Sequence, residues 1–139
     1  MKALFTPTMF TPTQWNTAED KAKFANHFVR FVDSDFKPTL FQKWFYARLS
    51  NTFGHIAHYN QGGFFEEFFT NDRDKIRFLT QTVQFPCYGD PRFTFSDVEQ
   101  ALAAHFKLND PRPKYQKADA ERLERVERAE LERLQAKYG

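Results

Sequence analysis

The sequence predicts an all-α protein: a compact bundle of about five helices with an aromatic-rich core and a long charged helix at the carboxyl end. The chain of 139 residues contains 18 Phe, 2 Trp and 5 Tyr, and these rings recur three and four residues apart, as on helical faces. Ile and Val, which favour sheets, are scarce, with two and five copies. The core is therefore expected to consist of rings packed between helices.

The first 16 residues contain Thr-Pro-Thr twice, at 6–8 and 11–13. Pro7 and Pro12 exclude a regular helix, so we expect an extended arm at residues 1–16. Its apolar side chains are expected to pack on the body: Leu4, Phe5, Phe10 and Trp15. The segments 3–10 and 92–95 are candidates for a minor β-hairpin, because Arg-Phe-Thr-Phe at 92–95 alternates between polar and apolar residues.

Helix boundaries follow from capping residues and breakers. Thr17, followed by acidic residues, predicts a helix that ends near 33–35. A second helix is expected from about 39 to 53, stopped by Gly54, and a third at 64–69 after a flexible Gly-Gly pair. A fourth begins near 74 and ends before Pro86. The Ser96–Glu99 capping box predicts the fifth.

The chain divides into a helical globular domain at 1–110 and a tail at 111–139 with a Pro-containing linker and a charged helix from about 118 to 137. Lys/Arg and Asp/Glu number 12 and 12 in the first part, and 8 and 6 in the second. The apolar residues of the tail only half fit a heptad repeat: Leu123, Val126, Leu131, Leu134 and Tyr138. This helix is expected to dock on the body, to pair with a partner (a homodimer being one form) or to project into solvent.

The composition limits the cellular compartment and the classes of partner that we expect. Cys87 is the only cysteine, so no intramolecular disulfide forms, and neither a secretory signal nor an apolar run of membrane-spanning length is present. We therefore expect a cytoplasmic protein without a membrane partner. The neutral charge of residues 1–110 disfavours, without excluding, a nucleic-acid binder.

The polar segment 54–63 contains the main binding candidates: His55, His58, Tyr59, Asn60 and Gln61. One helical turn would place both histidines on one face, as a metal site requires, with a ligand from Glu66 or Glu67. His-x-x-His without a fixed third ligand is also typical of structural histidines. We therefore predict no metal and no cofactor, and assign the segment to recognition.

Four rings at 64–69 give two alternatives for the next segment. If the rings are buried they form core. If some are exposed, Phe64 and Phe68, with Glu66 and Glu67 beside them, form a surface for a partner. Lys43 and Arg48, next to the rings at 44–46, are the candidate contacts of a nucleic-acid-binding alternative.

The function predicted from these features is that of a small non-catalytic interaction protein. It would be an adaptor or inhibitor that binds another macromolecule, with a protein as the expected partner, as accessory proteins of bacteria and mobile elements often do. Phosphate-binding glycine loops, Cys-x-x-Cys pairs and serine elbows do not occur in the sequence. The alternatives are a nucleic-acid-binding protein and a small metal-dependent or acid–base enzyme centred on His55 and His58.

Overall fold

The computed structural model of the chain describes residues 4–52, 60–84, 86 and 88–138. Within these ranges all regular structure is helical, which confirms the all-α prediction. The elements, in chain order, are two short 3-10 helices (η) and six α-helices: η1 (Pro7–Met9), α1 (Ala18–Asp33), η2 (Pro38–Leu40), α2 (Lys43–Thr52), α3 (Gln61–Phe69), α4 (Asp72–Gln84), α5 (Ser96–Leu108) and α6 (Arg112–Tyr138).

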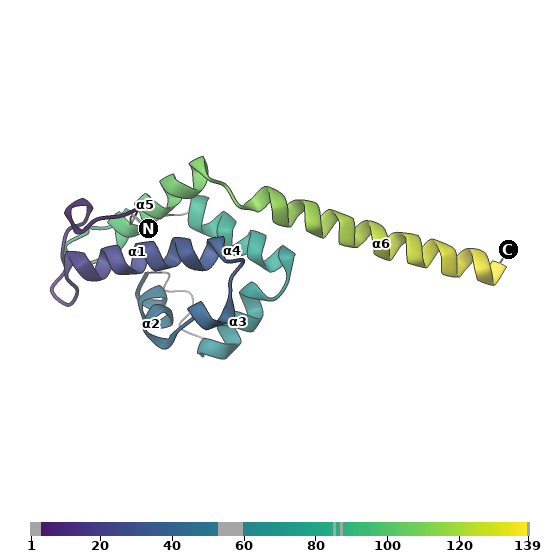
Figure 1. Cartoon of the computed structure of the whole chain (residues 1–139), viewed down its shortest axis with the longest axis horizontal. Helices are drawn as coiled ribbons and strands as arrows, with labels where there is room; N and C mark the ends of the chain where they lie inside the picture. Colours follow the sequence, from purple (N-terminus) through teal and green to yellow (C-terminus); the bar gives the residue numbers. More distant parts are fainter. Residues whose placement is uncertain (1–3, 53–59, 85, 87, 139) are drawn as a thin grey trace.

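Helix α1 crosses the body, with α2 and α3 on one side and α5 on the other (Figure 1). It begins at Thr17, as predicted, and Thr17 and Asp20 form a capping box by exchanging side-chain to backbone hydrogen bonds of 3.1 and 3.0 Å. Three rings of its buried face each reach a different helix. Phe24 stacks on α2, Phe28 on α4, and Phe31 meets α3 edge-on. The aromatic-rich core is therefore built around this helix.

The predicted β-hairpin is wrong for the described residues of both segments. Residues 7–9 form η1, and 91–93 form a turn in which the Phe93 and Thr94 amides both donate to the Asp90 carbonyl. The carbonyl oxygens of Pro91 and Thr94, which a strand would offer to its neighbour, instead accept hydrogen bonds from Lys21 Nζ. A buried amine has thus taken the place of a partner strand.

The second and third helices begin elsewhere than predicted. The expected helix at 39–53 divides into η2 and α2, so its first turn is a separate 3-10 turn. The Gly-Gly pair is not a flexible connection, because α3 already starts at Gln61. Asn60 caps this helix: its Oδ1 accepts the Gly63 amide at 2.6 Å.

The next two helices begin at polar residues. Asn71 caps α4, accepting the Asp74 amide at 2.9 Å. Helix α5 starts at Ser96 as predicted, but the expected capping box does not form. The Ser96 hydroxyl donates to the Gly89 carbonyl at 2.5 Å, so it ties α5 to the preceding loop.

Helix α6 starts at Arg112, before the predicted 118, since Pro113 lies in the first turn, where a missing N–H costs nothing. Its first part packs on α4. Tyr115 is its buried residue, and the Tyr115 hydroxyl donates to Asp35 Oδ1 at 2.7 Å. Asp35 and Phe36 both have left-handed backbone (φ 62° and 57°), which positions the Asp35 carboxylate for this bond. From residue 120 to 138 every residue is exposed, and the helix extends away from the body (Figure 1).

Candidate interaction surface

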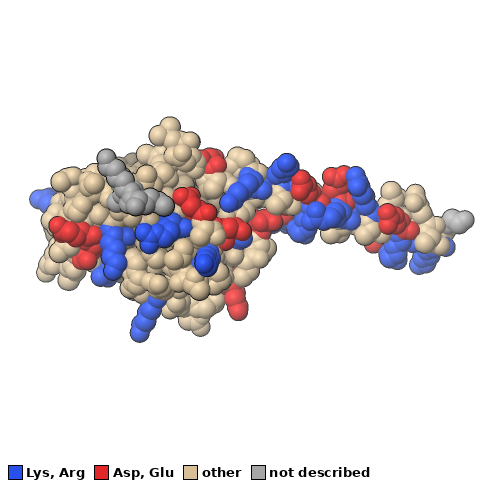
Figure 2. Space-filling view, in the orientation of Figure 1, with Lys and Arg blue, Asp and Glu red and all other residues tan. Residues whose placement is uncertain are grey.

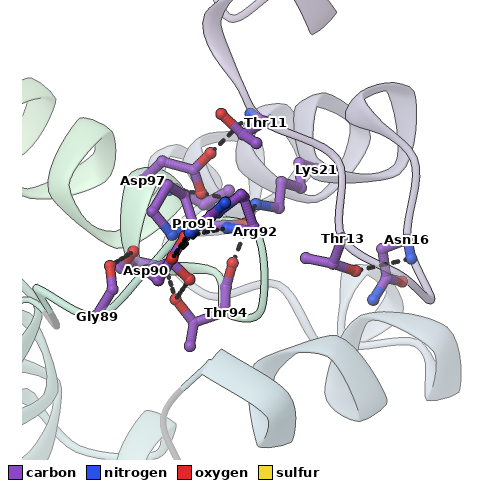
Figure 3. Close-up of polar contacts among 12 residues, drawn as sticks. Thr11, Thr13, Asn16, Lys21, Gly89, Asp90, Pro91, Arg92, Thr94 and Asp97 are labelled. Carbon is purple, nitrogen blue, oxygen red and sulfur yellow. Dashed lines mark hydrogen bonds and ion pairs between the residues drawn. The ribbon is translucent and has the colours of Figure 1, made fainter.

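A buried lysine organises the amino-terminal end of α1. Lys21 Nζ is fully shielded from solvent and donates to three acceptors: the carbonyls of Pro91 and Thr94 and the carboxylate of Asp97, at 2.9 to 3.0 Å. The second oxygen of Asp97 accepts the Thr11 amide at 3.0 Å. These five residues, the Lys21 cluster, join α1, α5, the 89–95 loop and the arm (Figure 3). The three acceptors occupy all three N–H donors of the ammonium, and such an arrangement is typical of a structural lysine.

The arm forms a tight turn just before α1. Thr13 Oγ1 accepts the amides of Trp15 and Asn16 at 3.1 and 2.9 Å, and the Thr13 amide donates to the Asn16 carbonyl at 2.8 Å (Figure 3). Phe10, before the turn, and Asn16, after Trp15, are both buried. Trp15 is held between these anchored residues, yet 71% of it is exposed. The prediction that Trp15 and Leu4 pack on the body is wrong, whereas Phe5 and Phe10 do pack there.

The loop before α5 presents a second exposed ring. Phe93 is 61% exposed, although its alternate neighbour Phe95 is buried. The loop is fixed by Asp90, whose carboxylate accepts bonds from the backbone amide and the guanidinium of Arg92. The same guanidinium holds the pKa of Asp90 below its ordinary value. Phe93 therefore projects from an ordered turn.

These two rings line one hollow of about 360 Å³, which we name the Trp15–Phe93 hollow. Its lining residues are Thr13, Trp15, Asn16, Phe93, Thr94 and Phe95. Asn16 Oδ1 is buried beside it and has no hydrogen-bond partner among the described residues. A second hollow, of about 400 Å³, adjoins the first across residues 13–16 and extends along the chain to Glu19.

The charge next to these hollows is negative. Glu19 lies in the exposed first turn of α1 and forms no ion pair with another described residue. Asp97, by contrast, is neutralised by Lys21, and Asp90 by Arg92. The surface thus combines two exposed rings with an uncompensated carboxylate, a combination that attracts apolar and cationic side chains.

Only part of the predicted binding segment at 54–63 lies within the described residues. His55, His58 and Tyr59 lie outside the described residues, so the histidine site stays a prediction. Asn60 caps α3, and Gln61 Nε2 donates to the Phe41 carbonyl at 2.9 Å. Both polar side chains therefore support the fold at this position. Among the described residues no three His, Cys, Asp or Glu side chains gather as a metal site would require.

The rings of α3 belong to the core. Phe64 and Phe68 are 0% and 5% exposed, so of the two alternatives the structure favours packing over partner contact. Glu66 and Glu67 are exposed, and Glu67 pairs with Arg77 at 3.0 Å. Of the four residues predicted to form a partner surface here, only Glu66 and Glu67 are exposed.

The residues of the nucleic-acid alternative lie on α2 beside rings that are already packed. Lys43 is exposed and Arg48 is half-buried. Trp44 has the Lys23 ammonium over its ring at 4.5 Å and His27 against it at 4.8 Å. Phe45 is wholly buried. Base stacking needs a free ring face, so it is disfavoured at Trp44 and Phe45, and nucleic-acid binding stays an untested alternative.

The exposed rings of Trp15 and Phe93 were not predicted as site residues. In the Thr-Pro-Thr-Gln-Trp-Asn segment, one local signal indicates that Trp15 is exposed. Thr13 can form a side-chain turn, and such a turn lies on the protein surface. For Phe93 the sequence gives the wrong indication, because alternation would place Phe93 and Phe95 on the same face.

Two further observations bear on the class of protein. No helix in the described part of the chain has the length and apolarity needed to cross a bilayer. Comparison with protein-family models, with curated proteins and with solved structures found no match for this chain.

Proposed function

We propose that this chain is a non-catalytic interaction protein, an adaptor or inhibitor, that binds another protein through the Trp15–Phe93 hollow. The observation that carries the proposal is that two large rings, 71% and 61% exposed, belong to residues that line one hollow. Trp is among the residues that contribute most to protein interfaces, where truncating a central ring costs about 2 kcal/mol or more.

The rigidity of the hollow supports a binding role. Trp15 and Phe93 lie on irregular backbone, yet the Lys21 cluster fixes both segments to helices α1 and α5. A surface that is ordered before binding loses little conformational entropy when a partner arrives. The buried Lys21 thus holds the arm and the 89–95 loop in place.

The partner that fits this surface presents a basic side chain next to an apolar one. An Arg or Lys stem can lie along the indole of Trp15 while its charge approaches Glu19. This contact would be sensitive to salt, since it lies at the exposed rim. An adaptor and an inhibitor would both use the surface in this way, because each acts by occupying its partner.

The test is a quantitative affinity purification with matched baits. Wild-type chain, Trp15→Ala/Phe93→Ala and the control Leu108→Ala, which removes an 87% exposed side chain of α5, are cross-linked in lysate of the source cells. We expect a stoichiometric protein that is retained by wild type and control and lost from the double variant. Absence of such a partner from the wild-type bait, or equal recovery by all three baits, would overturn the proposal.

A purified partner then allows a direct measurement of charge. Glu19→Lys reverses the carboxylate beside the hollow without altering either ring. We expect this variant to weaken binding about tenfold at low salt and less at high salt. Glu121→Lys, an exposed reversal on α6, is the matched control. Equal affinity for the two reversals would remove the basic-side-chain assignment while leaving the ring contacts in place.

A further inference from the structure

The exposed part of α6 carries a narrow apolar stripe. Its members are Ala120, Leu123, Leu131, Leu134 and Tyr138, with Glu127 in the remaining position. The spacing of three, four and four residues repeats every 11 residues. At about 100° per residue, all six positions fall within about 80° of the helix circumference. Around a straight helix an 11-residue stripe drifts by about 20° every 11 residues, whereas a heptad stripe drifts by about 20° every seven residues in the opposite direction.

The body leaves this stripe uncovered. All of its members are exposed, with Leu131 at 57% and Tyr138 at 75%. Tyr115 marks the side of α6 that packs on the body, and it lies about 120° around the helix from the centre of the stripe. The stripe therefore faces away from the contact with α4, along the part of α6 that projects from the body (Figure 1).

We propose that a second copy of the chain covers this stripe, and that two α6 helices pair antiparallel to form a homodimer. The segment 120–138 has five basic and five acidic residues, so two copies meet without net repulsion. Both signs alternate along its surface (Figure 2). The stripe also has nearly the same spacing in both directions, which places Ala120 opposite Tyr138 and Leu123 opposite Leu134 of the second copy.

Glu127 decides the orientation. In a parallel, in-register pair the two Glu127 carboxylates would face each other in the apolar seam, where like charges are costly. In the antiparallel pair each Glu127 faces Leu131 of the second copy. The acidic position then costs some stability and sets the direction of pairing, as single polar seam residues do in coiled coils.

The seam is short, about 27 Å from Ala120 to Tyr138 at 1.5 Å per residue. An interface of this size belongs to the small, reversible class. The dimer is therefore expected to dissociate in the micromolar range, and to be governed by protein concentration. Because the amino-terminal end of α1 and α6 lie at opposite ends of the molecule, an antiparallel dimer would present two Trp15–Phe93 hollows far apart (Figure 1).

The test is sedimentation equilibrium on the full chain from about 1 to about 500 µM, a range that brackets such affinities. We expect a monomer–dimer equilibrium for wild type and a monomer at every concentration for Leu123→Glu/Leu134→Glu. Val126→Glu is the matched control, because Val126 is 56% exposed but lies off the stripe. Glu127→Leu completes the seam and should tighten the dimer at least about tenfold. Far-UV circular dichroism checks that each variant keeps its helices.

Three results would overturn the proposal: a monomeric wild type over the whole range, equal effects of the stripe and control variants, or no tightening by Glu127→Leu. Orientation is measured separately in a Cys87→Ser background. A mixture of Ala120→Cys and Tyr138→Cys chains should form the mixed disulfide, and disulfides between identical chains would show parallel pairing instead. Trp15→Ala/Phe93→Ala should dimerise like wild type, so a failure of the binding function and a failure of the dimer are distinguishable.

Discussion

Replacing Lys21 with Met tests whether the buried amine holds the arm and the 89–95 loop. Met has a similar length and no charge, so the variant keeps the packing volume and removes three hydrogen bonds, each 2.9 to 3.0 Å long. Two partly buried carbonyls and one carboxylate then lose their lysine donor. Removing one partner of a buried ion pair costs about 3–5 kcal/mol.

For Lys21→Met, the expected loss of unfolding free energy lies at the lower end of this range. The Asp97 side chain is 18% exposed and keeps the amides of Thr11 and Val98 as donors, so water and backbone compensate in part. We expect the free energy of unfolding to fall by about 3 kcal/mol. Lys23→Met is the matched control, because Lys23 is an exposed lysine of the same helix over the ring of Trp44. Its loss should be below about 1 kcal/mol.

Urea unfolding followed by far-UV circular dichroism measures both variants, with the midpoint and slope fitted separately. A Lys21→Met loss no larger than that of Lys23→Met would refute the structural role. The double variant Lys21→Met/Asp97→Asn has no unpaired carboxylate. It should therefore be more stable, by about 1 kcal/mol or more, than the sum of the two single losses implies.

Three further variants test the histidine of α1, the base of α6 and the start of α3. Burial lowers the pKa of His27 below its ordinary value of 6.5. As the pH falls, the unfolded chain therefore binds a proton before the folded chain does. The free energy of unfolding should decrease below about pH 6.5, by at most about 1.4 kcal/mol per pH unit. His27→Gln should remove this part of the pH dependence of urea unfolding. Tyr115→Phe removes the bond to the Asp35 carboxylate and should cost about 1.5 kcal/mol or more in the same assay, with helix content unchanged. Asn60→Ala should cost about 1 kcal/mol, and Asn60→Asp much less.

Elements with local signals could be predicted from the sequence. Thr17 and Asp20 form the capping box that marks α1, and the apolar residues at three- and four-residue spacing on α1 and α5 are buried as expected. Caps and periodicity depend on residues within one or two turns, so they can be read without knowing the fold. The helix of the tail was predicted for the same reason.

Features decided by distant contacts could not be predicted in this way. Whether Ser96 caps α5 depends on Gly89, which offers a competing acceptor seven residues earlier. Gly62 and Gly63 favour a flexible connection by composition, whereas Asn60 caps a helix that already contains both glycines. The side chains of Ser96 and Asn60 can each form more than one local hydrogen bond, and tertiary packing determines which one forms.

The candidate surface also depends on distant contacts, although Lys21 carries one local signal of it. Lys21 lies three residues before Phe24 and seven before Phe28, so the helical period already places it on the buried face of α1. A lysine in that position requires acceptors from elsewhere in the chain, and loop carbonyls and a carboxylate are the available kinds. Those acceptors come from the 89–95 segment and α5, which is why Phe93 and Trp15 lie beside the same hollow. A charged residue on an apolar helix face therefore indicates an anchoring site, although it does not indicate which rings lie on the surface.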